Sequence, residues 1–317
     1  MKRHHLLQLF LFTTIVFLSY TFLQNTYTKV DIDVMKNIEV TKIDKSDSLY
    51  QEIVKKAKEY ETKPQNATID KVWKKMPGLS GLQVNIEKSY LNMKKKNKFD
   101  EKLIVYNNIR PEISLKDLPA SPIFRGHPDK NMVTFLINVS WGEEHIPDML
   151  KTLKKHKVKA TFFIDGAWAE KNVELVKMIK EEGHEIGSHG YNHPNMSRLS
   201  NEEIRNQLTK TNNILKSIVD EKPMYFAPPA GNYTDSVVKV ADELEMETIL
   251  WTVDTIDWQN PTKQALLNRV LTKVEPGTMI LMHPKEVTKD ALDELILKIK
   301  DKNYKIGTVG KLLDEER

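Results

Sequence analysis

The feature that most constrains the fold is a regular alternation of strand-like and helix-like segments after residue 129. Apolar, β-rich runs are predicted at 132–139, 159–164, 185–188, 224–227, 247–253, 278–282 and 304–308. Helical periodicity lies between them, and Ile146, Met149, Leu150 and Leu153 fall at i, i+3, i+4 and i+7. This alternation predicts an α/β fold with parallel strands and helices outside. We expect a distorted (β/α) barrel of about seven strands, with an open doubly wound sheet as the alternative.

The N-terminus predicts a membrane anchor. Lys2 and Arg3 precede an uncharged stretch from Leu6 to Leu23, which is just long enough for a thin membrane span. No small-x-small cleavage site follows. We therefore expect a signal anchor over residues 1–24 with the rest of the chain extracytoplasmic. A cleaved signal peptide, which would give a secreted protein, is the alternative.

Charge and composition divide the rest of the chain into a basic N-terminal region and a C-terminal domain. Residues 24–128 contain 20 Lys and Arg against 14 Asp and Glu, so we expect a basic N-terminal region over 25–128. It should hold a small α+β unit, with a strand through Leu82, Val84 and Ile86, and a proline-rich linker from Pro111 to Pro128. A third domain should span 129–317. The whole chain carries a net charge of only +4, which is too mild to indicate nucleic acid.

Cysteine is absent from the chain. That absence excludes a disulfide framework, a thiolate metal site and a cysteine nucleophile. Any metal must therefore be held by nitrogen or oxygen ligands.

Polar residues follow four of the predicted strands, where the chemistry of a barrel gathers. His189 and His193 follow the third strand, and this spacing suits two ligands of one metal. A stiff Pro228-Pro229-Ala230-Gly231 loop follows the fourth, Asp254 to Trp258 follow the fifth, and His283 follows the sixth. Each feature also has an ordinary explanation, namely surface or packed histidines, a plain turn, or the N-cap of a helix near Thr262.

Together, these motifs resemble the polysaccharide deacetylase family, the carbohydrate esterases (family 4) built on the NodB homology domain. The resemblance covers about residues 130–315. Its most diagnostic segments are Lys159-Ala160-Thr161-Phe162-Phe163, Gly183-His184-Glu185-Ile186-Gly187-Ser188-His189, Pro228-Pro229-Ala230-Gly231, Trp251 to Trp258, and Leu281-Met282-His283. The resemblance implies a distorted barrel, a divalent metal and hydrolysis of N-acetyl groups on amino-sugar polymers such as peptidoglycan or chitin. An anchored chain with a basic N-terminal region is similar to the sporulation-associated branch in bacilli.

The resemblance also implies a role for each matched residue. His189 and His193 would be ligands of the metal, usually zinc, with cobalt or nickel possible. Ala230, in the loop with Pro229, would supply a backbone N–H to the oxyanion, and Trp258 would line the substrate site. His283 would be the general acid, and Asp257 would orient it.

The first motif departs from the family pattern Thr-Phe-Asp-Asp-Gly. Aligned without gaps, this chain reads Leu136-Ile137-Asn138-Val139-Ser140. Asn138 takes the place of the general base, Val139 that of a metal-ligand Asp, and Ala227 that of an arginine that steadies the base. An amide cannot serve as a base near neutral pH. Joint loss of the buried Asp and Arg avoids an unpaired buried charge.

Two functions therefore remain open from the sequence. The chain is an extracytoplasmic amidohydrolase of weakened activity, with another base such as Asp165 or Glu143. Alternatively, it is a catalytically inactive relative that binds wall glycan or a partner during sporulation. Without a carboxylate ligand, the two histidines should bind metal more weakly than three protein ligands do.

Overall fold

The structure is a computed structural model that describes residues 14, 19 and 43–317. The predicted signal anchor over 1–24 therefore lies outside the described residues, apart from Thr14 and Ser19. Among the helices in the described part of the chain, none is long and apolar enough to cross a membrane. The described chain forms two compact units, one from residues up to 58 with 85–105, the other from 59–84 with 106–317.

The first unit is built on two helices, α2 (Ser48–Tyr60) and α3 (Ile86–Lys94). Tyr50 and Tyr90 pack edge to face, with ring centroids 5.6 Å apart. The prediction that Ile86 continues a strand is wrong. Asn85 accepts a hydrogen bond from the backbone N–H of Lys88 at 3.0 Å and so begins α3 at Ile86.

The second unit contains two small antiparallel strand pairs and a large parallel sheet. The strand pairs are β1 (Thr68–Asp70) with β2 (Lys74–Met76) and β3 (Gly81–Val84) with β4 (Tyr106–Ile109). The sheet runs in the order β10-β11-β5-β6-β7-β8-β9, and β12 also pairs with β5. Its strands are β5 (Met132–Val139), β6 (Thr161–Ile164), β7 (Glu185–Ser188), β8 (Tyr225–Phe226), β9 (Glu247–Thr248), β10 (Val253–Asp254), β11 (Met279–Met282) and β12 (Lys305–Gly307).

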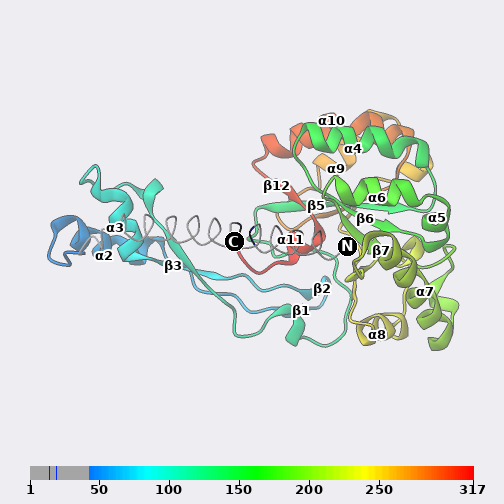
Figure 1. The fold of residues 1–317 in the computed structure, drawn as a ribbon, viewed down its shortest axis with the longest axis horizontal. Coiled ribbons are helices and arrows are strands. Elements are labelled where there is room, and N and C mark those ends of the chain that lie inside the picture. The colour runs from blue at the N-terminus through cyan, green and yellow to red at the C-terminus, as the bar shows by residue number, and fades with distance from the viewer. Residues whose placement is uncertain (1–13, 15–18, 20–42) are drawn as a thin grey trace, which may run out of the picture. The chain divides into compact units, whose positions relative to one another are not determined.

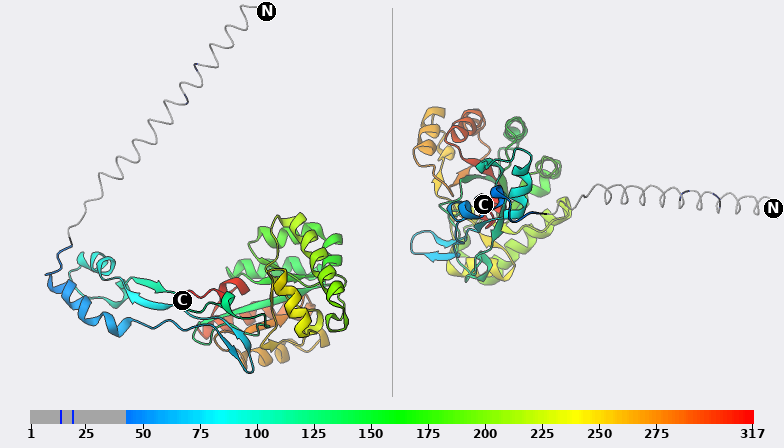
Figure 2. Two further views of the ribbon diagram at one scale, coloured as in Figure 1. Left: turned by 90° about the horizontal axis from the view of Figure 1, so that it is seen from below. Right: turned by 90° about the vertical axis from the view of Figure 1, so that its left-hand side faces the viewer.

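Helices cover the outside of this curled sheet (Figures 1 and 2). They are α4 (Ile146–Lys155), α5 (Gly166–Lys171), α6 (Val173–Glu181), α7 (Asn201–Val219), α8 (Asp235–Glu243), α9 (Lys263–Leu271) and α10 (Glu286–Asp301). The short α11 (Val309–Leu313) differs from them, because its apolar residues join the cluster in the barrel interior. The capping box predicted at the start of α7 is present, since Ser200 and Glu203 bond each other's backbone N–H groups. The parallel sheet with outer helices confirms the predicted α/β class.

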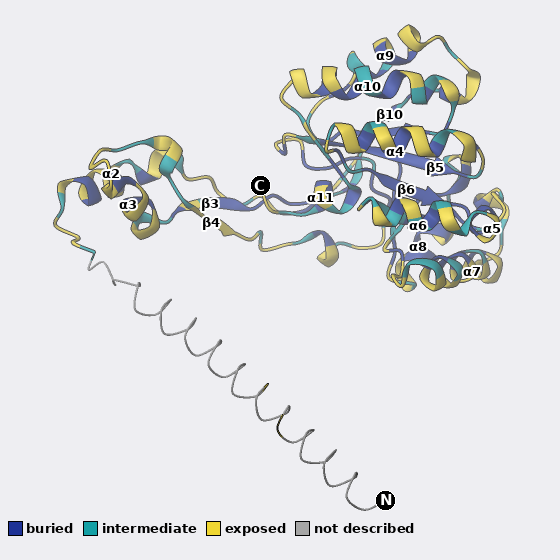
Figure 3. Ribbon diagram, turned by 45° about the horizontal axis from the view of Figure 1, so that its top comes forward, coloured by how far each residue is buried: buried dark blue, intermediate teal, exposed yellow. Residues whose placement is uncertain are grey.

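Successive side chains of β5 point to opposite faces of the sheet and therefore pack into two different apolar clusters. Val133, Phe135, Ile137 and Val139 belong to the apolar cluster under the helices. Leu136 instead joins the cluster in the barrel interior, and the period of two places Asn138 on that inner face as well. Both faces of β5 are buried (Figure 3), which explains why the strand reads as an almost continuous apolar run.

The barrel is closed by a segment from outside the predicted domain. Ile123 bonds Thr248 and Leu250 through its backbone, at 2.9 and 2.8 Å. Because Leu250 bonds this segment, the run predicted at 247–253 is two short strands, β9 and β10, rather than one. Leu115 and Ile123 also join the interior cluster. The proline-rich stretch predicted as a linker therefore contributes to the core of the second unit.

A turn at Gly277 contacts the closing segment at Gly126. This contact leads to a prediction about stability. Gly277 has φ +83°, and a Cβ there would lie 2.6 Å from the carbonyl oxygen of Gly126. Gly277→Ala should therefore lower the free energy of unfolding by about 2–4 kcal/mol, which combines left-handed strain and overpacking. Gly190→Ala is the matched control, because Gly190 has φ +71° but no contact nearer than 3.6 Å. The control should lose only about 1 kcal/mol in urea unfolding. Equal losses in the two variants would contradict this explanation.

Candidate functional site at the barrel mouth

Five of the strands bring the predicted residues to one end of the barrel. His189 directly follows β7, Asn138 lies at the end of β5, and His283 directly follows β11. The Pro229–Gly231 turn follows β8, and Asp257 follows β10. Because parallel strands end at the same edge, these residues meet at the C-terminal mouth. In the sheet order, β11 lies between β10 and β5, so His283 stands between the loops that carry Asp257 and Asn138.

His189 and His193 lie together, with ring centroids 5.2 Å apart. The Nδ1 atom of His189 is 2.7 Å from the carbonyl oxygen of Ala227, so Nδ1 carries the proton and Nε2 is left as an acceptor. Burial lowers the pKa of His189 to about 3, and the neighbouring His193 acts in the same direction. Burial also lowers the pKa of His193. Both imidazoles are therefore neutral near pH 7, as metal ligands must be.

Asp257 is hydrogen-bonded to His283. Its carboxylate is fully buried and lies 2.8 Å from His283 Nδ1, while its other oxygen accepts from the His283 backbone N–H and from Thr288 Oγ1, at 2.6 and 2.7 Å. Burial raises the pKa of Asp257, but the hydrogen bonds and the charge of His283 outweigh that effect and lower it overall. Asp257 is thus an ionised carboxylate that fixes the His283 ring.

The positions that depart from the family pattern, Asn138, Val139 and Ala227, carry no charged side chain in the structure. Asn138 is buried, and its Oδ1 makes no hydrogen bond with another described residue. Val139 offers no ligand atom, and its side chain belongs to the outer apolar cluster. Ala227 lies in the interior cluster with Leu136 and Phe163, and Phe163 is the β6 partner of Asn138. Positions 138 and 227 therefore share the barrel interior, and both are uncharged.

The donor set fits a metal only in part. His189 and His193 supply two neutral imidazoles, but no group of three or more His, Asp or Glu side chains that could hold a metal occurs in the described part of the chain. A catalytic zinc site normally has three protein ligands. The residues therefore do not provide the complete site that the family implies.

The loops around the mouth hold strained backbone. Ala230 has φ 52° and ψ 19°, a left-handed conformation that costs about 1–2 kcal/mol for a residue with a Cβ. His193, at φ 49°, is also left-handed, and its N–H donates to Asp165 Oδ2 at 2.8 Å. Strain of this kind concentrates at binding sites. Trp258 is 51% exposed, which is consistent with a surface open to a ligand.

Trp141 is a site residue that sequence reasoning missed. Its ring stacks on His283, with centroids 5.5 Å apart and planes 12° apart, and meets His193 edge to face at 6.0 Å. The Trp141 side chain is still 39% exposed, so it forms part of the surface of the barrel mouth. The sequence signal that could have identified Trp141 is its position two residues after the end of β5.

Neither alternative base is well placed for that role. Both oxygens of Asp165 accept backbone N–H groups, from Trp168 and from His193. Glu143 is exposed, and its own backbone N–H and the Trp168 indole N–H lower the pKa of its carboxyl. Asp165 is therefore a structural cap for the loop, and Glu143 is a poor proton acceptor.

The buried histidines predict acid sensitivity. Burial lowers the pKa of His189 to about 3 and that of His184 to about 4, whereas both rise to about 6.5 on unfolding. Below pH 6.5 the unfolded chain therefore binds protons that the folded chain cannot. Stability should fall by about 1.4 kcal/mol per pH unit for each histidine between about pH 6.5 and 4. His189→Gln should remove one of these contributions in urea unfolding, while Ser188→Ala should leave the slope unchanged. The same slope in parent and His189→Gln would refute the assignment.

Comparison with known proteins agrees with this geometry. A family model for polysaccharide deacetylases matches residues 125–249. The chain is 50% identical to the uncharacterized protein YlxY of Bacillus subtilis over 306 residues, 96% of each chain. It is 35% identical over 199 residues to a peptidoglycan-N-acetylglucosamine deacetylase of Bacillus cereus, and that match covers 61% of this chain and 72% of the relative.

Solved structures are also similar. BA3943 of Bacillus anthracis, described as a CE4 family pseudoenzyme, superimposes with a TM-score of 0.82 at 51% identity, over 86% of this chain and 97% of that one. A mutant of BA3943 described as having restored enzymatic activity gives a TM-score of 0.82 at 50% identity, over 85% and 99%. The chain therefore belongs to the polysaccharide deacetylase family, as a deacetylase-like member whose first motif is degraded.

Proposed function

We propose that this chain binds the amino-sugar polymer of the cell wall, peptidoglycan or a chitin-like glycan, and hydrolyses its N-acetyl groups weakly or not at all. The observation that carries the proposal is the buried, uncharged pair Asn138 and Ala227 beside the retained His189, His193 and His283. The general base is absent, while the groups that would contact an acetamido sugar are kept. The alternative, a slow hydrolase that uses another base, is weakened by the engaged oxygens of Asp165.

Binding without hydrolysis also explains the unpaired polar atoms at the mouth. Asn138 Oδ1, Ser140 Oγ and Ser188 Oγ are buried without a hydrogen-bond partner among the described residues. Buried polar atoms are normally satisfied by protein, water or a ligand. The hydroxyl and amide groups of a sugar supply suitable donors and acceptors, and the exposed Trp141 and Trp258 offer apolar faces to the sugar rings.

Any metal at the mouth would be held by His189 and His193 alone. Zinc suits imidazole ligands, and cobalt or nickel also suits them. When bound, such a metal would supply a Lewis acid for an acetyl carbonyl. Deacetylases of this family generally depend on metal, so a site without the carboxylate at position 139 further supports weak or absent hydrolysis.

Restoring the lost pair tests the proposal. The parent should bind chitooligosaccharide with little acetate release, whereas Asn138→Asp should raise acetate release because it restores a proton acceptor. General-base assistance is worth about 10²–10⁴-fold, and the gain should be partial because Val139 still withholds a ligand. The double variant Asn138→Asp with Ala227→Arg should do better, since the arginine keeps the new carboxylate ionised. Acetate release is measured with zinc or cobalt supplied.

Two further variants serve as controls. Ala227→Arg alone should lose about 3–5 kcal/mol of stability, because it places an unpaired charge in the barrel interior. Asn138→Leu should retain the fold and gain no activity. A parent as fast as ordinary family members would overturn the proposal, as would a parent that binds no glycan.

The location of the protein is also part of the proposal. We expect the segment Leu6–Leu23 to hold the chain on the outer face of a membrane during sporulation, next to the wall polymer. Cell fractionation with protease added from outside should find full-length protein in the membrane fraction and accessible to the protease. Soluble protein that begins near residue 25 would show cleavage and secretion instead. Protected full-length protein would show the opposite orientation.

A further inference from the structure

The loop that carries His193 has an unfavourable backbone conformation. It begins at His189 directly after β7, and Gly190, Asn192 and His193 have φ of +71°, 61° and 49°. Left-handed backbone is unfavourable for residues with a Cβ. Contacts from outside the loop must therefore hold its shape, and with it the spacing of the His189 and His193 imidazoles.

Side chains from two neighbouring segments bind this loop. Asp165 Oδ2 accepts the His193 N–H at 2.8 Å, and Gln207 Oε1 accepts the Tyr191 N–H at 2.9 Å. Gln207 lies in α7, whereas Asp165 directly follows β6. Asp165 is therefore the side chain that fixes the backbone of His193.

Asp165 also lies next to the position where the metal-ligand carboxylate of the family pattern is missing. Its N–H donates to the carbonyl oxygen of Val139 at 2.9 Å, and Val139 pairs with Ile164 across β5 and β6. Its Oδ1 accepts the Trp168 N–H at 3.0 Å and so begins α5. The chain thus lacks a carboxylate at the end of β5 and has a buried one at the end of the adjacent strand.

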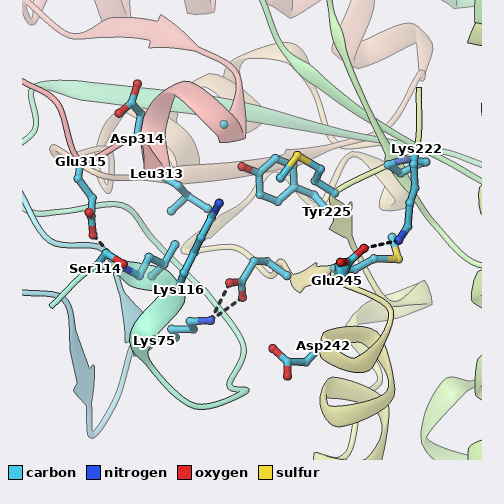
Figure 4. A pocket seen from close by; sticks show the side chains of 16 residues that line it. Lys75, Ser114, Lys116, Lys222, Tyr225, Asp242, Glu245, Leu313, Asp314 and Glu315 are labelled. Atoms are coloured by element: carbon cyan, nitrogen blue, oxygen red, sulfur yellow. Dashed lines mark hydrogen bonds and ion pairs between the residues drawn. The ribbon is translucent and has the colours of Figure 1, made fainter. Parts of the chain in front are cut away.

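Asp165 is buried without a cationic partner. It is 3% exposed and forms no ion pair with another residue among those that the structure describes. Asp257, by contrast, is paired with His283. At the opposite end of the barrel, Lys75 and Glu247 line a cavity of about 890 Å³, and buried Lys75 holds both oxygens of Glu247 at 2.7 and 2.9 Å (Figure 4). The start of α5 supplies only a partial positive charge. Because a buried charge is costly without a counter-charge, the region around Asp165 favours a cation.

We propose that Asp165 stabilises a divalent cation held by His189 and His193, although it is not itself a ligand. It fixes His193 in the loop, and it supplies the negative charge that the neutral side chains of Asn138 and Val139 lack. Two neutral imidazoles provide no counter-charge for a divalent cation, so a buried carboxylate beside them strengthens its binding. Asp165 is thus a positioning residue, which agrees with the engagement of both its oxygens by backbone N–H groups. The inference rests on the metal site included in the proposed function.

The test measures cobalt binding to the full-length protein in mild detergent, after chelator treatment, by competition with a fluorescent metal indicator. Asp165→Asn should weaken cobalt binding about 10–100-fold, the usual effect of replacing a residue that orients a metal ligand. Asn is as good an N-cap as Asp, so this variant keeps the start of α5 and loses the charge. Asp165→Ser is a second uncharged N-cap and should have the same effect. Asp165→Glu keeps the charge and should bind cobalt more tightly than either of these variants.

Two variants at other positions separate the charge from the geometry of the loop. Gln207→Ala removes the bond to Tyr191 but keeps Asp165, so its loss of cobalt affinity should be smaller than that of Asp165→Asn. Glu143→Gln removes a carboxylate that bonds the Trp168 indole and should leave cobalt affinity unchanged. Urea unfolding checks that each variant is folded.

Unchanged cobalt affinity in Asp165→Asn and Asp165→Ser would overturn the inference, as would equal losses in Asp165→Asn and Gln207→Ala. Asp165→Glu that binds cobalt no more tightly than Asp165→Asn would overturn it too. A parent that binds no cobalt would overturn both the inference and the proposed metal site. Chitooligosaccharide binding to the metal-free samples is a separate measurement, so failure of the glycan proposal is distinguishable from failure of this inference.

Discussion

The structure depends on the burial of one strand on both of its faces. β5 is hydrogen-bonded to β11 on one side and to β6 on the other, and β12 joins it near its start. Its outer face anchors the apolar layer under the helices, and its inner face enters the barrel interior. Since the strand is buried on both faces, a charge at its end needs a charged partner within the barrel. A charged side chain at position 138 therefore requires a charged partner at position 227.

This constraint gives a physical reason for the pattern of loss and retention at the mouth. Asn138 and Ala227 are both uncharged and face the same interior, so neither leaves a buried charge without a partner. The Asp257–His283 pair is kept, and Asp257 also accepts from Thr288. Losing Asp257 alone would leave three donors unsatisfied, namely His283 Nδ1–H, the His283 backbone N–H and Thr288 Oγ1. The Asp257–His283 pair therefore supports the fold as well as the geometry of the mouth.

The two ends of the barrel differ in the same physical terms. At the C-terminal end, neutral imidazoles and polar atoms without hydrogen-bond partners surround the barrel mouth, and Trp141 stacks on His283 there. At the other end, ion pairs and carboxylate-to-backbone bonds frame a separate cavity.

The sequence by itself determined the features that depend on local periodicity and spacing. The alternating strands and helices, the capping box at Ser200 and the placement of His189, His193 and His283 at strand ends all follow from short-range patterns. Tertiary structure alone decided that Ile123 pairs with Ile249 and so closes the barrel, and that Trp141 stacks on His283. These contacts join residues far apart in the chain, and no local pattern encodes such pairs, because their geometry exists only once the sheet has curled.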